Sequence, residues 1–405
     1  MSSSSENSDR QRSATTADGT DCVHGGDQRQ WCHGSIVDPI FPSTTYAFDS
    51  TDALVGHVTG EAPLTEYSRC GHPGEVHLER RLAALDDAPA AVLYGSGMAA
   101  VVGAIMAQVS SGDEILFFDE AYHHSREFCT EYLTKFGVRT HLVETGDYDA
   151  LESAINDRTR LMICESPTNP HMTVVDLQRY ADIGRRNNVT TMVDSTLATP
   201  INQRPFQFGV DYVVHSATKY LGGHNDLLAG VVLGSNEAIE PVRKLRTVMG
   251  GTIGAHTVYL LSRGLKTLEV RVQRQNANAQ AVAEFLHNHP RVDRAYYPGL
   301  RDHPTHAIAK QQMRGFGGLL MFSVKDADWK RASAVLDHLK LFRIAASLGG
   351  CESLAEQPKV FSHFSKTPEQ LAAIGFKENM IRISCGIENA EDLIADLDQA
   401  LKRSA

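Results

Sequence analysis

Short apolar runs alternate with helical-period segments through the middle of the chain. The apolar runs are rich in Val, Ile, Leu and Phe, and between them apolar residues recur with the spacing of an amphipathic helix. This alternation is typical of crossover units, in which helices bury both faces of a parallel sheet. Beyond Asp194 the runs come closer together, which predicts one antiparallel or irregular strand pair. The predicted strands are 114–118, 138–143, 161–164, 190–193, 212–214 and 230–233, and the predicted helices between the earlier ones are 97–109, 125–136, 148–156 and 175–186.

The pattern changes after about Gly264. Residues 268–287 have the spacing of a long amphipathic helix, and Pro290 ends it. These segments predict an α/β protein with a large domain over 71–264 and a smaller α+β domain over 265–405. The later strands are predicted at 318–324 and 381–384, and the later helices at 329–339 and 391–402.

The first 70 residues lack the alternation of the later chain. Residues 1–30 are rich in Ser, Thr, Gly and charged side chains, which cannot bury enough surface to offset the entropy of ordering. Residues 31–70 mix Pro, Ser, Thr and Tyr with little periodicity. We therefore expect a disordered tail followed by an extended N-terminal arm over 1–70.

Composition narrows the class of protein. Of 405 residues, 42% are hydrophobic and 22% charged, which fits a globular chain. The net charge is −10 with no basic stripe, which disfavours a nucleic-acid partner. No apolar run is long enough for a membrane span, and the first residues lack the apolar core of a secretory signal. Seven scattered cysteines without CxxC spacing fit a reducing cytoplasm, and Pro304 breaks the helical spacing of His303 and His306, so no metal site is predicted.

Lys219 stands out because its neighbours are apolar and hydroxylic rather than charged. It follows a predicted strand within Val213-Val214-His215-Ser216-Ala217-Thr218-Lys219-Tyr220. An arbitrary lysine belongs on a solvated surface, but a lysine desolvated at a strand end has a lowered pKa and forms an imine with an aldehyde. Ser216 and Thr218 on the same turn are suited to hydrogen-bond a phosphate. This combination is what pyridoxal phosphate requires.

Three further segments follow predicted strands or apolar runs. Ser96-Gly97-Met98 begins a helix, where glycine lets the backbone approach an anion, although a plain strand–helix turn explains it equally well. Asp194 closes an apolar strand, where a carboxylate needs a cation such as a protonated pyridine nitrogen, unless it caps the next helix. In Glu165-Ser166-Pro167-Thr168-Asn169-Pro170 the prolines fix a loop that presents Asn169. Ligands of open α/β sheets bind at this edge, so the segments together predict one site.

These motifs together resemble the Cys/Met-metabolism family of pyridoxal-phosphate enzymes, which includes cystathionine γ-synthase, cystathionine γ- and β-lyases and methionine γ-lyase. The resemblance extends from about Val23 to the C-terminus. It implies pyridoxal 5'-phosphate as the cofactor, amino acids as substrates, and an aminotransferase-type (fold type I) large domain with a mainly parallel sheet. It also implies a homotetramer of two dimers, with each active site shared across a dimer.

The resemblance implies a role for each matching residue. Lys219 would form the Schiff base, Asp194 would pair with the pyridine nitrogen, and Tyr122 would stack on the cofactor ring and help to move protons. Arg382 would bind the substrate α-carboxylate, a geometry that a guanidinium suits. The phosphate would be held by Gly97, Met98, Ser216 and Thr218, with Tyr67 and Arg69 reaching it from the neighbouring subunit, and the substrate would also contact Ser347, Asn169 and Tyr67.

Within the family, the chain most resembles plant-type cystathionine γ-synthases, for example in Gly222-Gly223-His224-Asn225-Asp226 and Gly349-Gly350-Cys351-Glu352-Ser353. His123 and His124 stand where many bacterial members have two glycines, and imidazoles at the distal end of the substrate would favour an anionic leaving group or a polar acceptor. The expected reaction is γ-replacement on an O-acyl or O-phospho homoserine by cysteine, giving cystathionine. The alternative is a C–S lyase of the cystathionine γ-lyase or methionine γ-lyase type, which releases a 2-oxo acid and ammonia. No single motif decides between these two reactions.

Two other classes of function fit less well. A serine hydrolase centred on Ser96 would need a GxSxG elbow, and Tyr94 stands in place of its first glycine. A catalytically silent binding protein would have no use for the combination of Lys219, Asp194 and Arg382.

Overall fold

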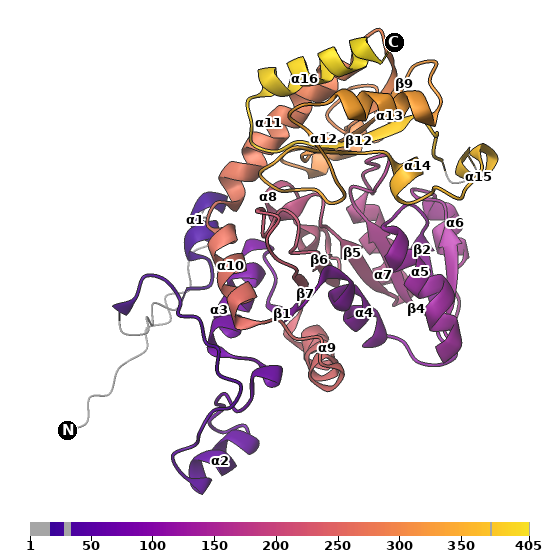
Figure 1. Ribbon diagram of the computed structural model, residues 1–405. Helices are drawn as coiled ribbons and strands as arrows, with labels where there is room; N and C mark the ends of the chain where they lie inside the picture. Colours follow the sequence, from indigo (N-terminus) through magenta and orange to yellow (C-terminus); the bar gives the residue numbers. More distant parts are fainter. Residues whose placement is uncertain (1–16, 28–33, 373–374, 405) are drawn as a thin grey trace.

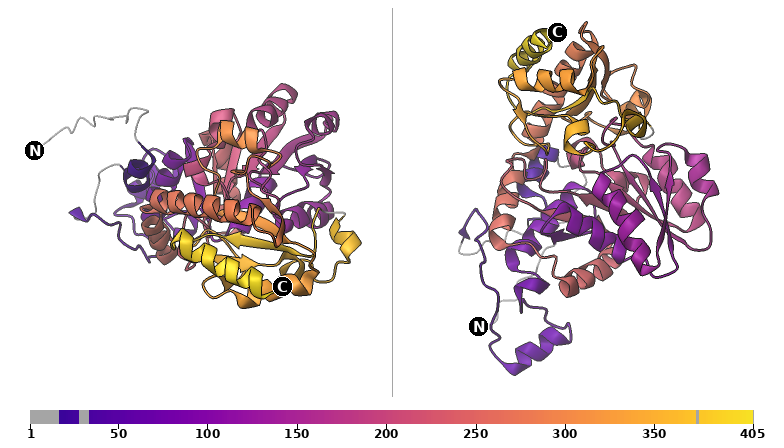
Figure 2. Two further views of the ribbon diagram at one scale, coloured as in Figure 1. Left: turned by 90° about the horizontal axis from the view of Figure 1, so that it is seen from above. Right: turned by 45° about the vertical axis from the view of Figure 1, so that its right-hand side comes forward.

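Two sheets, each with its own helices, make up the described chain (Figure 1). The computed structural model describes residues 17–27, 34–372 and 375–404. The larger sheet has seven strands in the order β1-β7-β6-β5-β4-β2-β3, and the smaller has five in the order β10-β11-β12-β9-β8. The smaller sheet and its helices lie above the larger unit (Figure 2). The predicted α/β class is confirmed, while the boundary at 264/265 stays a prediction.

The strands of the large sheet run in one direction except for β7, which lies next to the edge strand β1. β6, β5, β4, β2 and β3 run parallel, whereas β7 is antiparallel to both β6 and β1. The prediction of crossover units with an antiparallel pair beyond Asp194 is therefore confirmed. Its strands are β1 (Ala90–Tyr94), β2 (Glu114–Phe118), β3 (Arg139–Val143), β4 (Thr159–Glu165), β5 (Thr190–Asp194), β6 (Tyr212–His215) and β7 (Gly230–Gly234).

Helices cover both faces of this sheet, which is why its strands are nearly continuous apolar runs. On one face Val193 and Val213 pack with α3 (Pro73–Leu85) and α7 (Leu177–Asn187). On the other, Met192 and Val214 pack with α4 (Gly97–Met106) and α9 (Asn236–Met249). The predicted helix at 125–136 is instead divided into α5 (His123–Glu127), a π-helical turn η3 (Phe128–Tyr132) and the 3-10 helix η4 (Leu133–Phe136). The shorter elements are α6 (Tyr148–Ser153), α8 (Thr199–Asn202), α10 (Ala255–Leu265), η2 (Ser68–Cys70) and η5 (Pro205–Phe208).

Three long helices cover one face of the small sheet. Ile381 and Ile383 of β12 (Met380–Ser384) pack against α11 (Leu268–His287), α13 (Trp329–His338) and α16 (Ala390–Arg403). Because side chains alternate along a strand, Arg382 projects from the opposite face, toward the large unit. The remaining elements are β8 (Val292–Tyr296), β9 (Leu319–Val324), β10 (Arg343–Ile344), β11 (Leu354–Glu356), α12 (His306–Gln312), α14 (Pro358–Phe361) and α15 (Pro368–Ala372).

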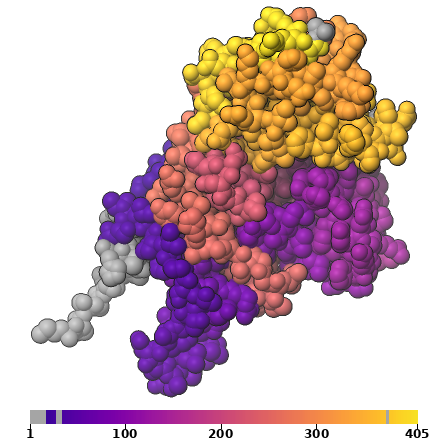
Figure 3. All heavy atoms as spheres, viewed as in Figure 1, coloured from indigo at the N-terminus to yellow at the C-terminus, as the bar shows by residue number. Residues whose placement is uncertain are grey.

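The N-terminal segment is more structured than the sequence predicts. The predicted tail contains α1 (Asp18–His24), where Cys22 is buried against the large unit and Asp18 pairs with Arg204 at 2.7 Å. This part of the predicted tail is therefore helical rather than disordered, because the buried Cys22 side chain and the ion pairs of Asp18 with Arg204 and Arg314 hold it against the large unit. Residues 1–16 and 28–30 lie outside the described residues. The arm does leave the body, and it carries α2 (Thr51–Val58) away from both sheets (Figure 3).

No helix within the described ranges is long and apolar enough to cross a membrane.

Candidate active site

A cavity of ≈ 1110 Å³ lies where the strand ends of the large sheet face the small sheet. Parallel strands present their carboxyl ends at a single edge, so residues that follow different strands meet there. The cavity brings together most of the predicted site residues, namely Gly97, Met98, Tyr122, Asn169, Asp194, Ser216, Thr218, Lys219, Ser347 and Arg382.

The Lys219 amine projects into this cavity from the turn after β6. Its Nζ donates a hydrogen bond to Ser347 Oγ at 2.8 Å. Burial lowers the pKa of Lys219, and the guanidinium of Arg382 lowers it further. An amine with a lowered pKa is more often neutral, which is the form that attacks an aldehyde.

The N-terminus of α4 forms a close cradle with Ser216. Ser96 caps the helix by accepting a hydrogen bond from the Ala99 amide at 3.1 Å. A Cβ on Gly97 would lie 2.6 Å from Ser216 Oγ, so only glycine lets these two segments approach so closely. Free amides at a helix start, beside a serine hydroxyl, make a site for a phosphate. Thr218 is less available, since its hydroxyl donates to the Ala229 carbonyl at 3.1 Å.

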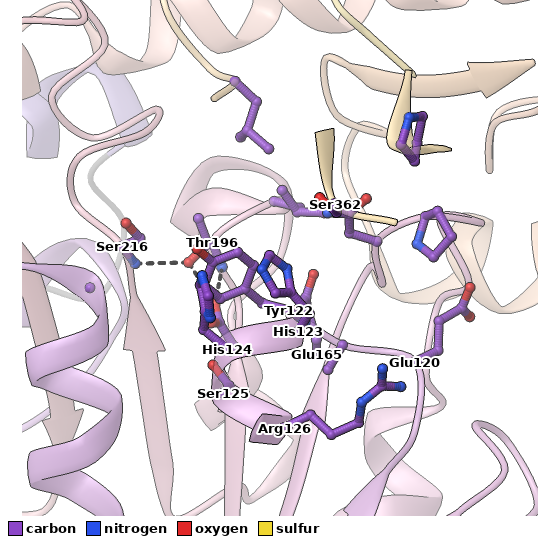
Figure 4. A pocket seen from close by; sticks show the side chains of 18 of the residues that line it. Glu120, Tyr122, His123, His124, Ser125, Arg126, Glu165, Thr196, Ser216 and Ser362 are labelled. Atoms are coloured by element: carbon purple, nitrogen blue, oxygen red, sulfur yellow. Dashed lines mark hydrogen bonds between the residues drawn. The ribbon is translucent and has the colours of Figure 1, made fainter. Parts of the chain in front are cut away.

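Thr196 links the two sides of this site. Its hydroxyl donates to Asp194 Oδ1 at 2.5 Å and accepts from the Ser216 amide at 2.8 Å (Figure 4). The Thr196 amide also donates to Asp194 Oδ1 at 3.0 Å. Burial raises the pKa of Asp194 and these hydrogen bonds oppose the rise. One threonine therefore orients the predicted pyridine partner and the predicted phosphate turn together.

Tyr122 is held at the cavity wall by Glu165. The Tyr122 amide donates to Glu165 Oε2 at 2.7 Å, and its ring lies with those of His123 and His124 on the same wall (Figure 4). Glu165 and Asp194 pair in register on adjacent parallel strands, so their side chains share a face. Burial, together with the charge of Asp194, raises the pKa of Glu165 well above its usual value. Two adjacent buried carboxyl groups disfavour ionisation of both at once, and at Glu165 burial and the charge of Asp194 both favour the protonated form.

Arg382 enters the cavity from the small sheet. Its Nη2 donates to the Ser347 carbonyl at 2.9 Å, and its Nη1 pairs with Glu356 Oε1 at 3.0 Å. Ser347 has a φ of +89°, a backbone region that side-chain-bearing residues rarely adopt. Through its hydroxyl and its carbonyl, this one residue connects the Lys219 amine to the Arg382 guanidinium.

Tyr67 and Arg69 do not line the cavity of their own chain. Arg69 Nη1 donates to the Thr247 carbonyl at 2.9 Å, and its guanidinium lies 5.5 Å from the centre of the Tyr67 ring. The expectation that both reach the site of a neighbouring subunit stays a prediction.

Sequence reasoning missed several cavity residues. Thr196 stands two residues after Asp194, and its hydroxyl could have been expected to bond that carboxylate, as an ST-type turn does. Glu356 gave no signal, because only its pairing opposite Arg382 in the small sheet brings it to the site. His303 and His306 are not among the residues that line this cavity. The His303 ring is hydrogen-bonded to the carbonyl of His171, and the His306 ring to the carbonyl of Pro298.

The comparisons with known proteins agree on one family. A family model described as "Cys/Met metabolism PLP-dependent enzyme" matches residues 19–402. The chain is 39% identical over 397 residues to the chloroplastic cystathionine gamma-synthase 1 of Arabidopsis thaliana, covering 97% of this chain and 70% of that protein. It is also 39% identical over 388 residues to L-methionine gamma-lyase of Pseudomonas putida, covering 95% and 97%.

Two solved structures share the whole fold. The crystal structure of MetB from Corynebacterium glutamicum gives a TM-score of 0.90 at 35% identity, covering 96% of this chain and 99% of that one. A putative O-acetylhomoserine (thiol)-lyase, MetY from Campylobacter jejuni, gives 0.89 at 28% identity, covering 96% and 100%, and contains an N'-pyridoxyl-lysine-5'-monophosphate.

The fold and the site define a fold type I pyridoxal-phosphate enzyme. More particularly, the chain belongs to the Cys/Met metabolism PLP-dependent enzyme family. The residues of the cavity fit this cofactor, since the cavity combines a partly buried lysine amine and a strand-end carboxylate with a cradle that a Cβ on Gly97 would fill. The family and cofactor predictions are confirmed. Relatives at the same identity include a synthase and a lyase, so the family places the enzyme in sulfur amino acid metabolism without choosing the reaction.

Proposed function

We propose that this enzyme performs γ-replacement, joining an activated homoserine, esterified with an acyl or a phosphoryl group, to cysteine to give cystathionine. The observation that carries the proposal is the meeting of Lys219, Asp194 and Arg382 in one large cavity. Its ≈ 1110 Å³ exceeds the range of about 300–1,000 Å³ that is usual for small-molecule pockets. This volume suits a site that holds a cofactor and two amino acids. The similarity to plant cystathionine gamma-synthases supports the same choice.

Each residue has a distinct part in this proposal. When bound, pyridoxal phosphate supplies the electron sink that acidifies the Cα proton of the amino acid. The Lys219 amine would take that proton and carry it away from Cα, and once it has given the proton up it would take one from Cβ. The group on Cγ would then leave with the electrons of its bond to Cγ. Asp194 keeps the pyridine nitrogen protonated, and Arg382 fixes the α-carboxylate so that the Cα proton stays beside Lys219. Tyr122 assists Lys219 at the cavity wall.

The second candidate is a C–S lyase, which the 39% identity to L-methionine gamma-lyase favours. The two activities differ in what meets the unsaturated product of γ-elimination. A thiol gives cystathionine, whereas water gives a 2-oxo acid and ammonia. His123 and His124, on the cavity wall beside Tyr122, are placed to influence this choice at the distal end of the substrate.

One assay separates the candidates. The purified protein is incubated with O-acetyl-, O-succinyl- or O-phosphohomoserine, with and without cysteine, and separately with cystathionine or methionine. Formation of cystathionine that depends on cysteine supports the synthase. Release of 2-oxobutyrate from cystathionine or methionine, without synthesis of cystathionine, supports the lyase. The Lys219→Ala variant is the control, and turnover unchanged in it would contradict both.

The shared active site and the compartment also belong to this proposal. Since Tyr67 and Arg69 belong to the N-terminal arm and do not line the cavity of their own chain, they support a dimer in which each chain completes the phosphate site of the other, within the predicted tetramer. A cytoplasmic location stays a prediction, because one similar plant protein is chloroplastic.

A further inference from the structure

The guanidinium that would bind substrate already has an anionic partner. Arg382 Nη1 lies 3.0 Å from Glu356 Oε1, and both side chains are more than nine-tenths buried. Strand pairing fixes this contact, since Glu356 of β11 is the cross-strand neighbour of Arg382 in β12. Both residues line the cavity. Glu356 therefore orients the guanidinium from one side, as the Ser347 carbonyl does from the other.

This pair creates a conflict of charge when an amino acid binds. The α-carboxylate of the substrate would add a second anion to one guanidinium in a buried space. Two carboxylates that share such a site do not both stay ionised, and one of them retains a proton. The α-carboxyl group is the stronger acid of the two, so the proton goes to the glutamate.

The groups around Glu356 allow this proton uptake. Burial raises the pKa of Glu356, while Arg382 and then Lys219 lower it. The other titratable groups that act on Arg382 are Tyr220, which follows Lys219, Glu165 at the end of β4, and Tyr122 at the start of α5. Burial raises the pKa of Glu165 and of Tyr122, which favours the uncharged form of both. A second carboxylate on Arg382 cancels most of the attraction by which the guanidinium keeps Glu356 ionised. Burial, which favours the protonated form of Glu356, then dominates.

We propose that Glu356 is a positioning residue for Arg382 that takes up one proton from solvent when the α-carboxylate of the substrate binds. The ion pair between Glu356 and Arg382 is then exchanged for an ion pair between the substrate and Arg382, and the neutral glutamate remains as a hydrogen-bond partner. This inference rests on the proposed function only in that an amino-acid carboxylate binds at Arg382, and it holds for synthase and lyase alike.

The test uses 2-hydroxybutyrate, which carries the carboxylate but has no amine to displace Lys219. Its inhibition constant against amino-acid turnover is measured with the holoenzyme from pH 6 to 9. If binding takes up one proton, the constant rises by up to about tenfold per pH unit, because each unit changes the free energy by 1.36 kcal/mol. Glu356→Gln keeps an acceptor for Arg382 but cannot take up a proton, so its profile should lack this rise.

Two controls separate this role from simple structural support. Glu352→Gln removes an exposed carboxylate that accepts from Asn225 Nδ2 at 2.7 Å, and it should keep the wild-type slope. If Glu356→Gln fails to load cofactor, Glu356→Asp should load it and keep the slope. Calorimetry of 2-hydroxybutyrate binding in two buffers of different ionisation enthalpy counts the same proton directly.

The outcomes are distinct. Equal slopes in wild type and Glu356→Gln, or a flat wild-type profile, overturn the inference and leave the proposed function standing. Loss of all amino-acid turnover in the wild type refutes the proposed function, and calorimetry still decides whether a carboxylate takes up a proton at Glu356. A wild-type slope that Glu356→Gln abolishes and Glu352→Gln keeps supports the inference.

Discussion

Replacing Gly97 with alanine tests whether the start of α4 holds the cofactor phosphate. The new Cβ would lie 2.6 Å from Ser216 Oγ and 2.7 Å from Ser216 Cβ, whereas ordinary contacts begin near 3.4 Å. The helix start and the Ser216 turn must therefore separate by roughly 0.8 Å. Forcing an extra methyl group into a packed site costs about 1–3 kcal/mol. If this cost falls mainly on the phosphate-bound state, the dissociation constant for pyridoxal phosphate rises about 5- to 150-fold.

Cofactor titration of the apoprotein measures this change through the absorbance of the bound cofactor. Thermal unfolding of the apoprotein, measured in parallel, separates a loss of binding from a loss of folding. Gly254→Ala is the matched control, since Gly254 likewise lies at a helix N-terminus, as the N-cap of α10, and its Cβ would meet open space. If Gly97→Ala binds the cofactor as tightly as Gly254→Ala, the phosphate does not lie between α4 and Ser216, and our placement of the cofactor is wrong.

Three further predictions follow from the same geometry. Asp194→Asn should weaken cofactor binding by about tenfold to a hundredfold, the loss expected when a charge-assisted hydrogen bond is removed, and equilibrium titration checks it. Burial lowers the pKa of Lys219, so the folded apoprotein binds a proton there less readily than the unfolded chain does. Lys219 therefore reduces the free energy of unfolding, by most below its folded pKa and by progressively less as the pH rises toward 10.5. Urea unfolding should accordingly find apo Lys219→Met more stable than the wild type at pH 7, with the advantage shrinking at pH 9.5; an advantage that grows with pH would contradict the assignment. If the arm of a partner completes each site, inactive Arg69→Ala and Lys219→Ala chains refolded together should recover about a quarter of the wild-type activity. Random pairing makes half of the dimers mixed, and each mixed dimer has one intact site of two. No recovery would mean that both groups act within one chain.

The large unit was predictable because each of its signals is local. A buried parallel strand is a continuous apolar run, and the predicted site residues lie at or just beyond its end: Asp194 is the last residue of β5, and Lys219 lies in the turn after β6. The long helix α11 was predicted at its observed bounds, since its apolar periodicity is uninterrupted until His287.

The small sheet was harder to predict. β10 and β11 have two and three residues, too few for a periodicity to show. β8 carries exposed Asp293 and Arg294 in its middle, which weakens any apolar run. α1 was missed because it depends on contacts with residues far along the chain, including Arg204 and Arg314, that no local pattern records.

The difference between local signals and long-range contacts also explains why the cofactor was easier to infer than the reaction. The residues predicted to hold the cofactor come from the strand ends of a single sheet, so their spacing along the chain is a signature. The residues predicted to contact the substrate come from two sheets, and Ser347 joins them because its hydroxyl accepts from Lys219 and its carbonyl accepts from Arg382. Glu356 reaches the site only through its register with Arg382. We therefore expect substitutions at the wall formed by His123 and His124 to change the choice between substrates, and substitutions at Glu356 to change the binding of the α-carboxylate that all amino-acid substrates share, in both cases with the cofactor still bound.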